Sequence, residues 1–269
     1  MKTVITMTSW TKRIKYVGRA IYRFLTTQTI KPDLFYLWLA EAEFPNKEKD
    51  LPEDLILICK KFNIQINWTV DNEYCHKRWY VYPKHYEDLV ISIDDDVFYD
   101  KNLIKQAINY SNNLHNCIIN CGDYLYPILD YTNGIQRTFH NAIPDKPCHK
   151  ILLCGQCIVL PKSFPLEAIS PENIILRKKY CKKCDECWLT PFIFNSNTNI
   201  MAHKWNNIVN NNIQNTATWK QIIKTKYIQI YLALRCNSDN LINWKKIYPK
   251  FNDKNYSNKT KDEILKLLV

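Results

Sequence analysis

Residues 89–99 read Leu89-Val90-Ile91-Ser92-Ile93-Asp94-Asp95-Asp96-Val97-Phe98-Tyr99, so five apolar or small residues are followed by three consecutive aspartates. The first five predict a buried strand, which the aspartates end because they are poor strand formers and costly to bury unpaired. In open α/β sheets, ligands bind in the crevice at the carboxyl ends of the strands. The stretch therefore predicts a sheet edge that binds a cation. An acidic, solvated turn is the simpler alternative.

Asp94 and Asp96 are two residues apart, so on an extended backbone their side chains point the same way. Two carboxylates are hard oxygen ligands that suit Mg²⁺ or Mn²⁺, with the phosphates of a substrate completing the coordination shell. We therefore expect a divalent cation here, bound together with a phosphate-bearing substrate.

Composition narrows the class of protein. The chain has 269 residues, enough for one large domain, with 11 cysteines and a formal net charge of +11. No apolar stretch reaches the roughly 18 residues of a membrane span, and the first residues are too polar for a signal peptide. We therefore expect a cytosolic protein whose cysteines are thiols.

The positive charge would attract phosphates, nucleic acid or anionic lipid. The basic residues are spread along the chain, and the sequence has no recognition helix, zinc finger or RNA-binding signature. A phosphate-bearing substrate, or a peripheral position on the inner membrane surface, accounts for the charge, and no nucleic-acid partner is expected.

Apolar runs alternate with segments of helical periodicity along the chain. Strands are predicted over residues 3–8, 34–39, 64–68, 89–93, 117–121 and 199–203. A helix capped by Ser9 or Thr11 is expected after the first strand, and further helices are expected over 55–61, 101–114 and 216–235. This alternation predicts a three-layer α/β/α sandwich with a mainly parallel central sheet.

In such a sheet the polar residues that follow several strands meet at one edge. Thr8 and Ser9 follow the first strand, Asp71 and Asn72 the third, and Asp94–Asp96 the fourth. This convergence is a stronger indication of a binding site than any one of the motifs.

A second acidic motif occurs late in the chain, in Cys181-Lys182-Lys183-Cys184-Asp185-Glu186-Cys187-Trp188-Leu189. Acidic residues at a helix start are favoured by the helix dipole alone, but one of this pair could also be a general base. The apolar residues that would carry this helix into the core are Trp188, Leu189, Phe192 and Ile193.

The three cysteines of this motif, Cys181, Cys184 and Cys187, are spaced like metal ligands. A fourth ligand for a structural zinc could come from Cys148, His149, Cys154 or Cys157. Zinc sites usually have two separated Cys-x-x-Cys pairs, and this chain has one run, so free thiols are the favoured interpretation.

With these pieces, the chain resembles bacterial glycosyltransferases of the GT-A fold, in particular the family 2-like and capsular-polysaccharide group. The resemblance covers residues 1–110 well and 150–205 more weakly. The matching segments are 5–14, 28–33 with 37–39, Glu43-Phe44-Pro45, Leu51-Pro52, the Asp-x-Asp strand end at 93–99, and the acidic-pair-x-Trp motif at 185–189.

The resemblance implies a role for each candidate residue. Seven residues would bind the nucleotide-sugar donor: Thr8, Ser9, Arg13, Asp71, Lys77, Asp94 and Asp95. Among these, Asp71 would contact the base, Lys77 the base or the phosphates, and Asp94 the ribose. The residues that would hold Mn²⁺ or Mg²⁺ are Asp96, Asp94 and His203. Glu186, with Asp185 as the alternative, would take the proton from the acceptor hydroxyl.

The implied function is metal-dependent transfer of a sugar, with inversion, from a nucleotide-diphosphate sugar, UDP being the expected nucleotide. The acceptor would be a glycan or lipid-linked glycan in capsule or lipopolysaccharide synthesis. Residues 1–110 would bind the donor and 111–215 the acceptor, and 216–269 would be a helical extension of the same domain. Two rivals stay open. One is a metal-dependent phosphotransferase or nuclease, although Phe98 replaces the Thr of Asp-x-Asp-x-Thr. The other is a non-catalytic basic binding module.

Overall fold

The computed structural model describes residues 1–97, 99–121, 124–125, 140–141, 156–183, 185, 188–189, 192–193, 196 and 198–202. The elements within these residues are β1 (Thr3–Thr8), α1 (Ile14–Thr27), β2 (Leu34–Ala40), the 3-10 helix η1 (Lys47–Asp50), α2 (Glu53–Lys61), β3 (Gln65–Thr69), the 3-10 helix η2 (Tyr74–Val81), β4 (Leu89–Ile93), α3 (Leu103–Asn113), β5 (Cys117–Asn120), β6 (Tyr124–Leu125), β7 (His140–Asn141), β8 (Cys157–Val159), the 3-10 helix η3 (Leu166–Ile169), α4 (Pro171–Tyr180) and β9 (Asn199–Ala202). No helix in this part of the chain is long and apolar enough to cross a membrane.

A seven-stranded sheet forms the centre of the fold, in the order β3-β2-β1-β4-β8-β5-β9. The four strands β3, β2, β1 and β4 are parallel to one another. β8 lies between β4 and β5 and is antiparallel to both, while β5 and β9 are parallel. β6 and β7 pair separately. The sheet is therefore mainly parallel, as the sequence predicts.

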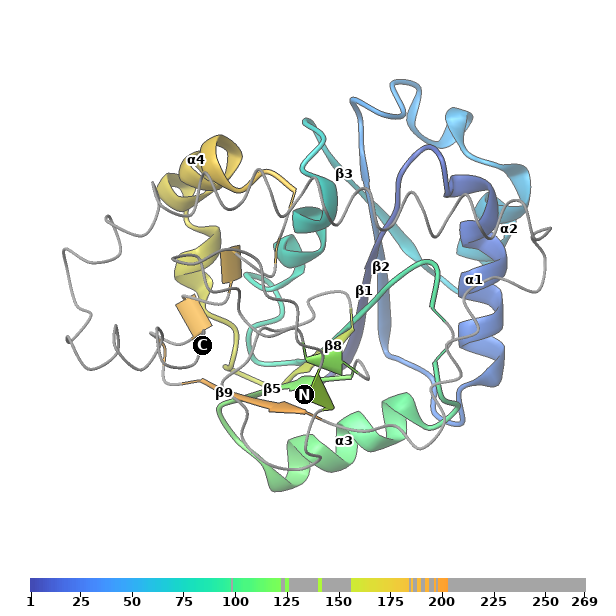
Figure 1. Ribbon diagram of the computed structural model, residues 1–269. Coiled ribbons are helices and arrows are strands. Elements are labelled where there is room, and N and C mark those ends of the chain that lie inside the picture. Colours follow the sequence, from blue (N-terminus) through green and yellow to red (C-terminus); the bar gives the residue numbers. More distant parts are fainter. Residues whose placement is uncertain are drawn as a thin grey trace.

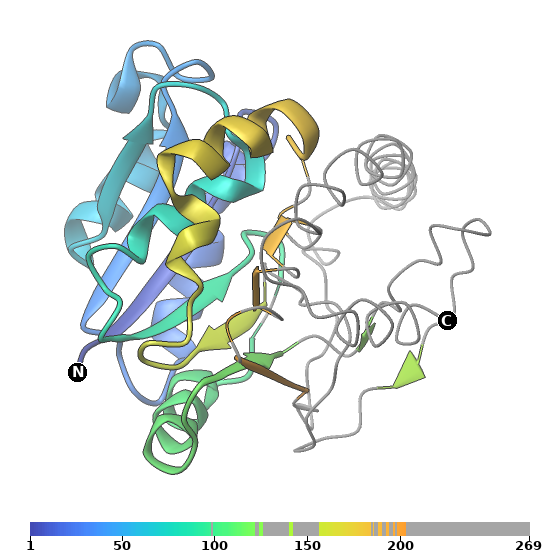
Figure 2. The same cartoon turned by 90° about the vertical axis from the view of Figure 1, so that its left-hand side faces the viewer.

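Side chains alternate along each strand and give the sheet two apolar faces. On one face, Ile5, Leu37 and Ile91 belong to a core that α1, α2 and α3 complete. On the other face, Val4 and Val90 belong to a second core with residues of η2, η3 and the helical residues 188–189 and 192–193. Figures 1 and 2 show α1 and α2 on the opposite side of the sheet from α4. The three-layer α/β/α prediction is confirmed.

The two helices nearest the first strands pack closely because a glycine lies between them. A Cβ on Gly18 of α1 would lie 3.2 Å from the Cα of Leu55 in α2 and 3.2 Å from the Cδ1 of Ile58. The side chains around this contact, including Val17, Ile21 and Leu55, are fully buried. α1 and α2 thereby pack as one layer against the face of the sheet that carries Ile5 and Leu37.

Two sequence expectations about the helices are corrected. Neither Ser9 nor Thr11 caps α1, which has Arg13 at its N-cap position and no capping side chain. The sequence analysis also missed α4, in which the Ser170 hydroxyl accepts a hydrogen bond from the Asn173 N–H and Pro171 occupies the first turn. The helix expected over 216–235 and most of the segment 122–148 lie outside the described residues.

Candidate functional site

The carboxyl ends of the four parallel strands lie at one edge of the sheet, as predicted. The register places Thr8 of β1 beside Trp38 of β2, and Met7 beside Ile93 of β4. On the other side of β2, Ala40 lies beside Thr69 of β3. The residues that follow these strands, including Ser9, Asp71 and Asp94–Asp96, are therefore brought to the same edge.

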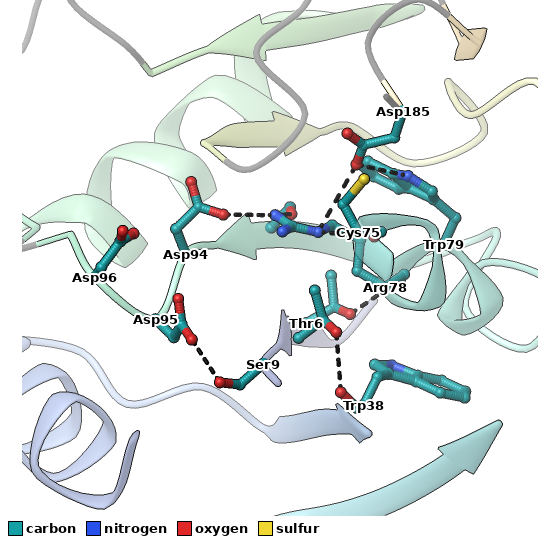
Figure 3. A network of polar contacts seen from close by, with 12 residues as sticks. Thr6, Ser9, Trp38, Cys75, Arg78, Trp79, Asp94, Asp95, Asp96 and Asp185 are labelled. Atoms are coloured by element: carbon teal, nitrogen blue, oxygen red, sulfur yellow. Dashed lines mark hydrogen bonds and ion pairs between the residues drawn. The ribbon is translucent and has the colours of Figure 1, made fainter. Parts of the chain in front are cut away.

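The three aspartates after β4 take different positions at this edge. Asp95 is buried, and its Oδ2 accepts a hydrogen bond of 2.5 Å from the Ser9 hydroxyl. Figure 3 shows Asp95 turned toward Ser9 while the carboxylates of Asp94 and Asp96 point away from it. Asp95 thus attaches the β1–α1 loop to the end of β4, and the other two carboxylates face the site.

Arg13, at the start of α1, bridges two of these carboxylates. Its Nη1 lies 2.7 Å from Asp95 Oδ1 and 2.8 Å from Asp96 Oδ2. Burial opposes the positive charge, but Asp95 and Asp96 outweigh this effect and raise the pKa of the Arg13 guanidinium. Burial and the neighbouring Asp95 and Asp94 raise the pKa of Asp96 to about 7, although Arg13 opposes this shift. Arg13 is thus a single positive charge shared between two carboxylates.

Arg78 of η2 pairs with the remaining aspartate of the motif. Its Nη1 lies 2.9 Å from Asp94 Oδ1 and 3.2 Å from the Ser92 hydroxyl oxygen. Its Nε donates to the Cys75 carbonyl and lies 3.9 Å from Asp185 Oδ2. Burial disfavours this cation, yet Asp94 and Asp185 more than compensate and raise the pKa of Arg78. The sequence around Arg78 predicts no role for it, because its carboxylate partners Asp94 and Asp185 lie in other segments of the chain.

Asp185 lies close to the Asp-x-Asp motif in space. Its Oδ2 accepts a hydrogen bond of 3.1 Å from the indole N–H of Trp79, and Asp185 as a whole is only 3% exposed. The late acidic motif and the strand end therefore meet through Arg78 (Figure 3). Glu186 and His203 lie outside the described residues, so the catalytic assignment of the pair and the third metal ligand stay predictions.

Lys77 lies in η2, where it is 1% exposed, with its Nζ 3.7 Å from Glu43 Oε2. Burial lowers the pKa of Lys77 and raises the pKa of Glu43, while their mutual attraction opposes both shifts. The Glu43 Oε2 atom has no hydrogen-bond partner among the described residues. Glu43 follows β2 at the same edge, which is the signal that would have made it a site candidate.

Asp71 lies in the loop after β3 and forms an ion pair with Lys178 of α4. Its Oδ2 is 2.9 Å from the Nζ of Lys178, which also lies 3.2 Å from Glu73 Oε1. The buried Arg177 pairs with Glu73 on the other side of the same helix end. Because the sequence analysis missed α4, it missed this support for Asp71. Thr8, the remaining donor-site candidate, uses its hydroxyl to donate to the Trp38 carbonyl.

The cysteine run is described only in part. Cys181 is buried, its carbonyl oxygen lies 3.0 Å from His76 Nε2, and the Cys75 thiol lies 3.4 Å from the Lys183 carbonyl. No disulfide bond joins any two of the described cysteines, which are Cys59, Cys75, Cys117, Cys121, Cys157 and Cys181. Cys184, Cys187 and three of the four suggested additional ligands (Cys148, His149 and Cys154) lie outside the described residues, so the zinc alternative is untested.

The residues at the sheet edge suit a hard divalent cation. The side chains of Asp94 and Asp96 are 26% and 22% exposed, so both carboxylates can be reached from solvent. No group of three or more Cys, His, Asp or Glu side chains placed to hold a metal occurs within the described ranges. Mg²⁺ is usually bound by one or two carboxylates, with substrate phosphates and water completing its shell. Asp94 and Asp96 fit that arrangement.

Comparison with known proteins adds little to these observations. No family model and no curated protein matches the chain. Among solved structures, the fold is similar to that of S. aureus TarS 1–349, with a TM-score of 0.46 and 14% sequence identity. The match covers 76% of this chain and 60% of the TarS structure. A likeness at this level shows nothing about the activity of this protein.

Proposed function

We propose that this protein is a metal-dependent glycosyltransferase of the GT-A type that takes a sugar from a nucleotide-diphosphate sugar, with UDP as the expected nucleotide. The observation that carries the proposal is the edge where β1, β3 and β4 end. There, Asp94 and Asp96 face the site, and Arg13 and Arg78 lie beside them. A metal-bound diphosphate requires carboxylates that bind the metal ion and, beside them, positively charged side chains that bind the phosphates.

The donor would lie along this edge with its base toward β3. Asp71 would contact the base, and Lys77, whose Nζ lies 3.7 Å from Glu43 Oε2, would contact the base or the phosphates. Asp94 would contact the ribose, and Asp96, with Asp94 and His203, would hold Mn²⁺ or Mg²⁺. The cation would stabilise the negative charge that develops on the diphosphate as the glycosidic bond breaks.

The acceptor hydroxyl would lose its proton to a carboxylate of the late acidic motif. We assign Glu186 as this base, because Asp185 already receives the Trp79 indole and lies near Arg78. As the proton moves to the Glu186 carboxylate, the acceptor oxygen forms the new bond to the anomeric carbon. The bond to the diphosphate breaks on the opposite face, which inverts the configuration.

The acceptor is proposed to be a glycan or lipid-linked glycan of the capsule or lipopolysaccharide type, and the transferred sugar a hexose or N-acetylhexosamine. The net charge of +11 supports a position at the inner membrane surface, where anionic lipids attract basic proteins.

The test is to measure the binding of UDP, GDP, CDP and CMP, each with and without Mn²⁺, by thermal shift and by calorimetry. A ligand that binds only the folded state raises its apparent stability. We expect one nucleoside diphosphate to bind only with Mn²⁺, and CMP to bind weakly because it lacks the second phosphate. Absence of nucleotide binding under every condition would contradict the proposal and favour a phosphotransferase or a binding module.

The matched variants are Asp96→Asn and Asp54→Asn. Both remove one carboxylate, but Asp54 is an exposed residue in the first turn of α2, outside the site. Asp96→Asn should weaken Mn²⁺-dependent nucleotide binding by at least about tenfold, and Asp54→Asn should leave it unchanged. Equal affinities for the two variants would remove Asp96 from the metal site.

A further inference from the structure

Arg13 has two carboxylate partners that differ in how firmly they are held. Both contacts are made by Nη1, at 2.7 Å to Asp95 and 2.8 Å to Asp96. The Asp95 side chain is 5% exposed and also receives the Ser9 hydroxyl, so it is fixed from two sides. The Asp96 side chain is 22% exposed, and that of Arg13 is 33% exposed. The Arg13–Asp95 contact is thus internal, while the Arg13–Asp96 contact faces the site.

The Arg13–Asp96 contact occupies the carboxylate that the proposed function gives to the divalent cation. A divalent cation bound to the Asp96 carboxylate would repel the guanidinium that lies 2.8 Å from its Oδ2, because both groups carry positive charge. A guanidinium has five N–H donors, and both of these contacts use the same nitrogen. Arg13 can therefore release Asp96 and keep Asp95, with N–H groups left for another anion.

We propose that Arg13 substitutes for the divalent cation in the ligand-free protein, neutralising Asp96, and that it is transferred to the donor diphosphate when the cation binds. The inference rests on the proposed function, because it takes the donor to be a nucleoside diphosphate. Arginine suits this exchange, since its planar fork pairs with carboxylates and phosphates in the same way. Arg13 would then be a donor-binding residue that also offsets part of the negative charge of the acidic edge between reaction cycles.

The proposal predicts effects of opposite sign for one substitution. Arg13→Gln removes the competitor for Asp96, so Mn²⁺ alone should bind about 3- to 10-fold more tightly than to the wild type. The same substitution removes charge-assisted hydrogen bonds to the diphosphate. A nucleoside diphosphate should therefore bind about 10- to 100-fold more weakly at saturating Mn²⁺. A residue that only stabilised the loop would weaken both.

The experiment uses the full chain in four forms: wild type, Arg13→Gln, Arg13→Lys and Lys15→Gln. Mn²⁺ is titrated alone, and UDP, GDP and CDP are then titrated at saturating Mn²⁺. Lys15→Gln is the matched control, because it removes one positive charge from an exposed position in the first turn of the same helix. Arg13→Lys keeps the charge but not the planar fork, so its Mn²⁺ affinity should lie between those of the wild type and Arg13→Gln.

The titration with Mn²⁺ alone tests the inference in the absence of any nucleotide. Tighter Mn²⁺ binding by Arg13→Gln, with no comparable change for Lys15→Gln, supports it. Unchanged or weaker Mn²⁺ binding by Arg13→Gln, or an equal gain for Lys15→Gln, overturns it, as does a lack of Mn²⁺ binding by every form. If Arg13→Gln does not fold, the same comparison is made with Arg13→Lys. Wild-type protein that binds Mn²⁺ but no nucleotide instead refutes the proposed function.

Discussion

His76 makes the stability of this protein depend on pH in a way that a single substitution can isolate. The side chain is 1% exposed, and its Nε2 lies 3.0 Å from the Cys181 carbonyl. A carbonyl can only accept, so Nε2 carries the hydrogen and Nδ1 is the bare nitrogen. Nδ1 is buried without a hydrogen-bond partner among the described residues. Protonating the ring would therefore place an unpaired N–H and a charge in the interior.

The magnitude follows from the pKa of His76. Burial, reinforced by the positive charge of Arg177, lowers this pKa from its ordinary value of 6.5 to about 3. The unfolded chain therefore binds a proton between these values that the folded protein does not, so stability is lost as pH falls below 6.5. Between about pH 7.5 and pH 5.0, this single group should cost about 2 kcal/mol of unfolding free energy.

The assay is urea denaturation of wild type and His76→Gln at about pH 7.5 and pH 5.0. Glutamine can still donate to the Cys181 carbonyl, but it does not titrate. His115→Gln, at an exposed position, controls for the loss of a histidine as such. The wild type should lose about 2 kcal/mol more than His76→Gln over this interval. Equal losses, within about 0.5 kcal/mol, would refute the buried, neutral state of His76.

Three further outcomes are expected. Glu186→Gln should preserve donor binding but lower kcat by about 100-fold or more; a loss of this size in Asp185→Asn with binding intact would place the base at Asp185. Lys178→Gln should release Asp71 and weaken nucleotide binding by about 3-fold in a titration. Stability should change little, because the Lys178–Asp71 pair is exposed and Glu73 keeps Arg177 as a partner. Unchanged affinity would place Asp71 outside the donor site. Gly18→Val should destabilise the protein by about 1–3 kcal/mol in urea, because its side chain meets the Leu55 backbone; an unaffected midpoint would contradict this close packing.

The strands of the parallel half could be predicted because each is a short apolar run bounded by polar residues. The run 89–93 is buried throughout, and the predicted strand over 3–8 matches β1. The position of β8 could not be predicted, because nothing in three apolar residues says that they enter the sheet between β4 and β5. Strand order depends on contacts between segments far apart in the chain.

The helix α4 was missed because its buried side includes an arginine. Hydrophobic periodicity detects apolar stripes, and here Arg177 is 1% exposed while Ile175 is 67% exposed. The helix start was nevertheless visible, since Ser170, Pro171 and Glu172 form a favourable first turn. Capping signals, used together with hydrophobic periodicity, would have found this helix, although not its contact with Asp71, which spans 107 residues.

The candidate site was predictable in its residues but not in its partners. Three aspartates after a strand stand out in any sequence, and so does an acidic pair before Trp188. The distribution of Arg13 and Arg78 among the carboxylates depends on contacts that span 82 and 16 residues for Asp95 and Asp94. The same applies to Asp185, whose contact with Trp79 spans 106 residues.

The placement of β8 has a consequence for the order of folding during synthesis. β4 pairs with β1 on one side and with β8 on the other, and β5 also reaches β4 only through β8. During synthesis, residues 89–93 are made long before residues 157–159, the strand that completes their pairing. Until then, a strand of four apolar residues and Ser92 presents an open edge, a feature that promotes aggregation of nascent chains. We expect the half-made chain to need a chaperone more than the finished protein does.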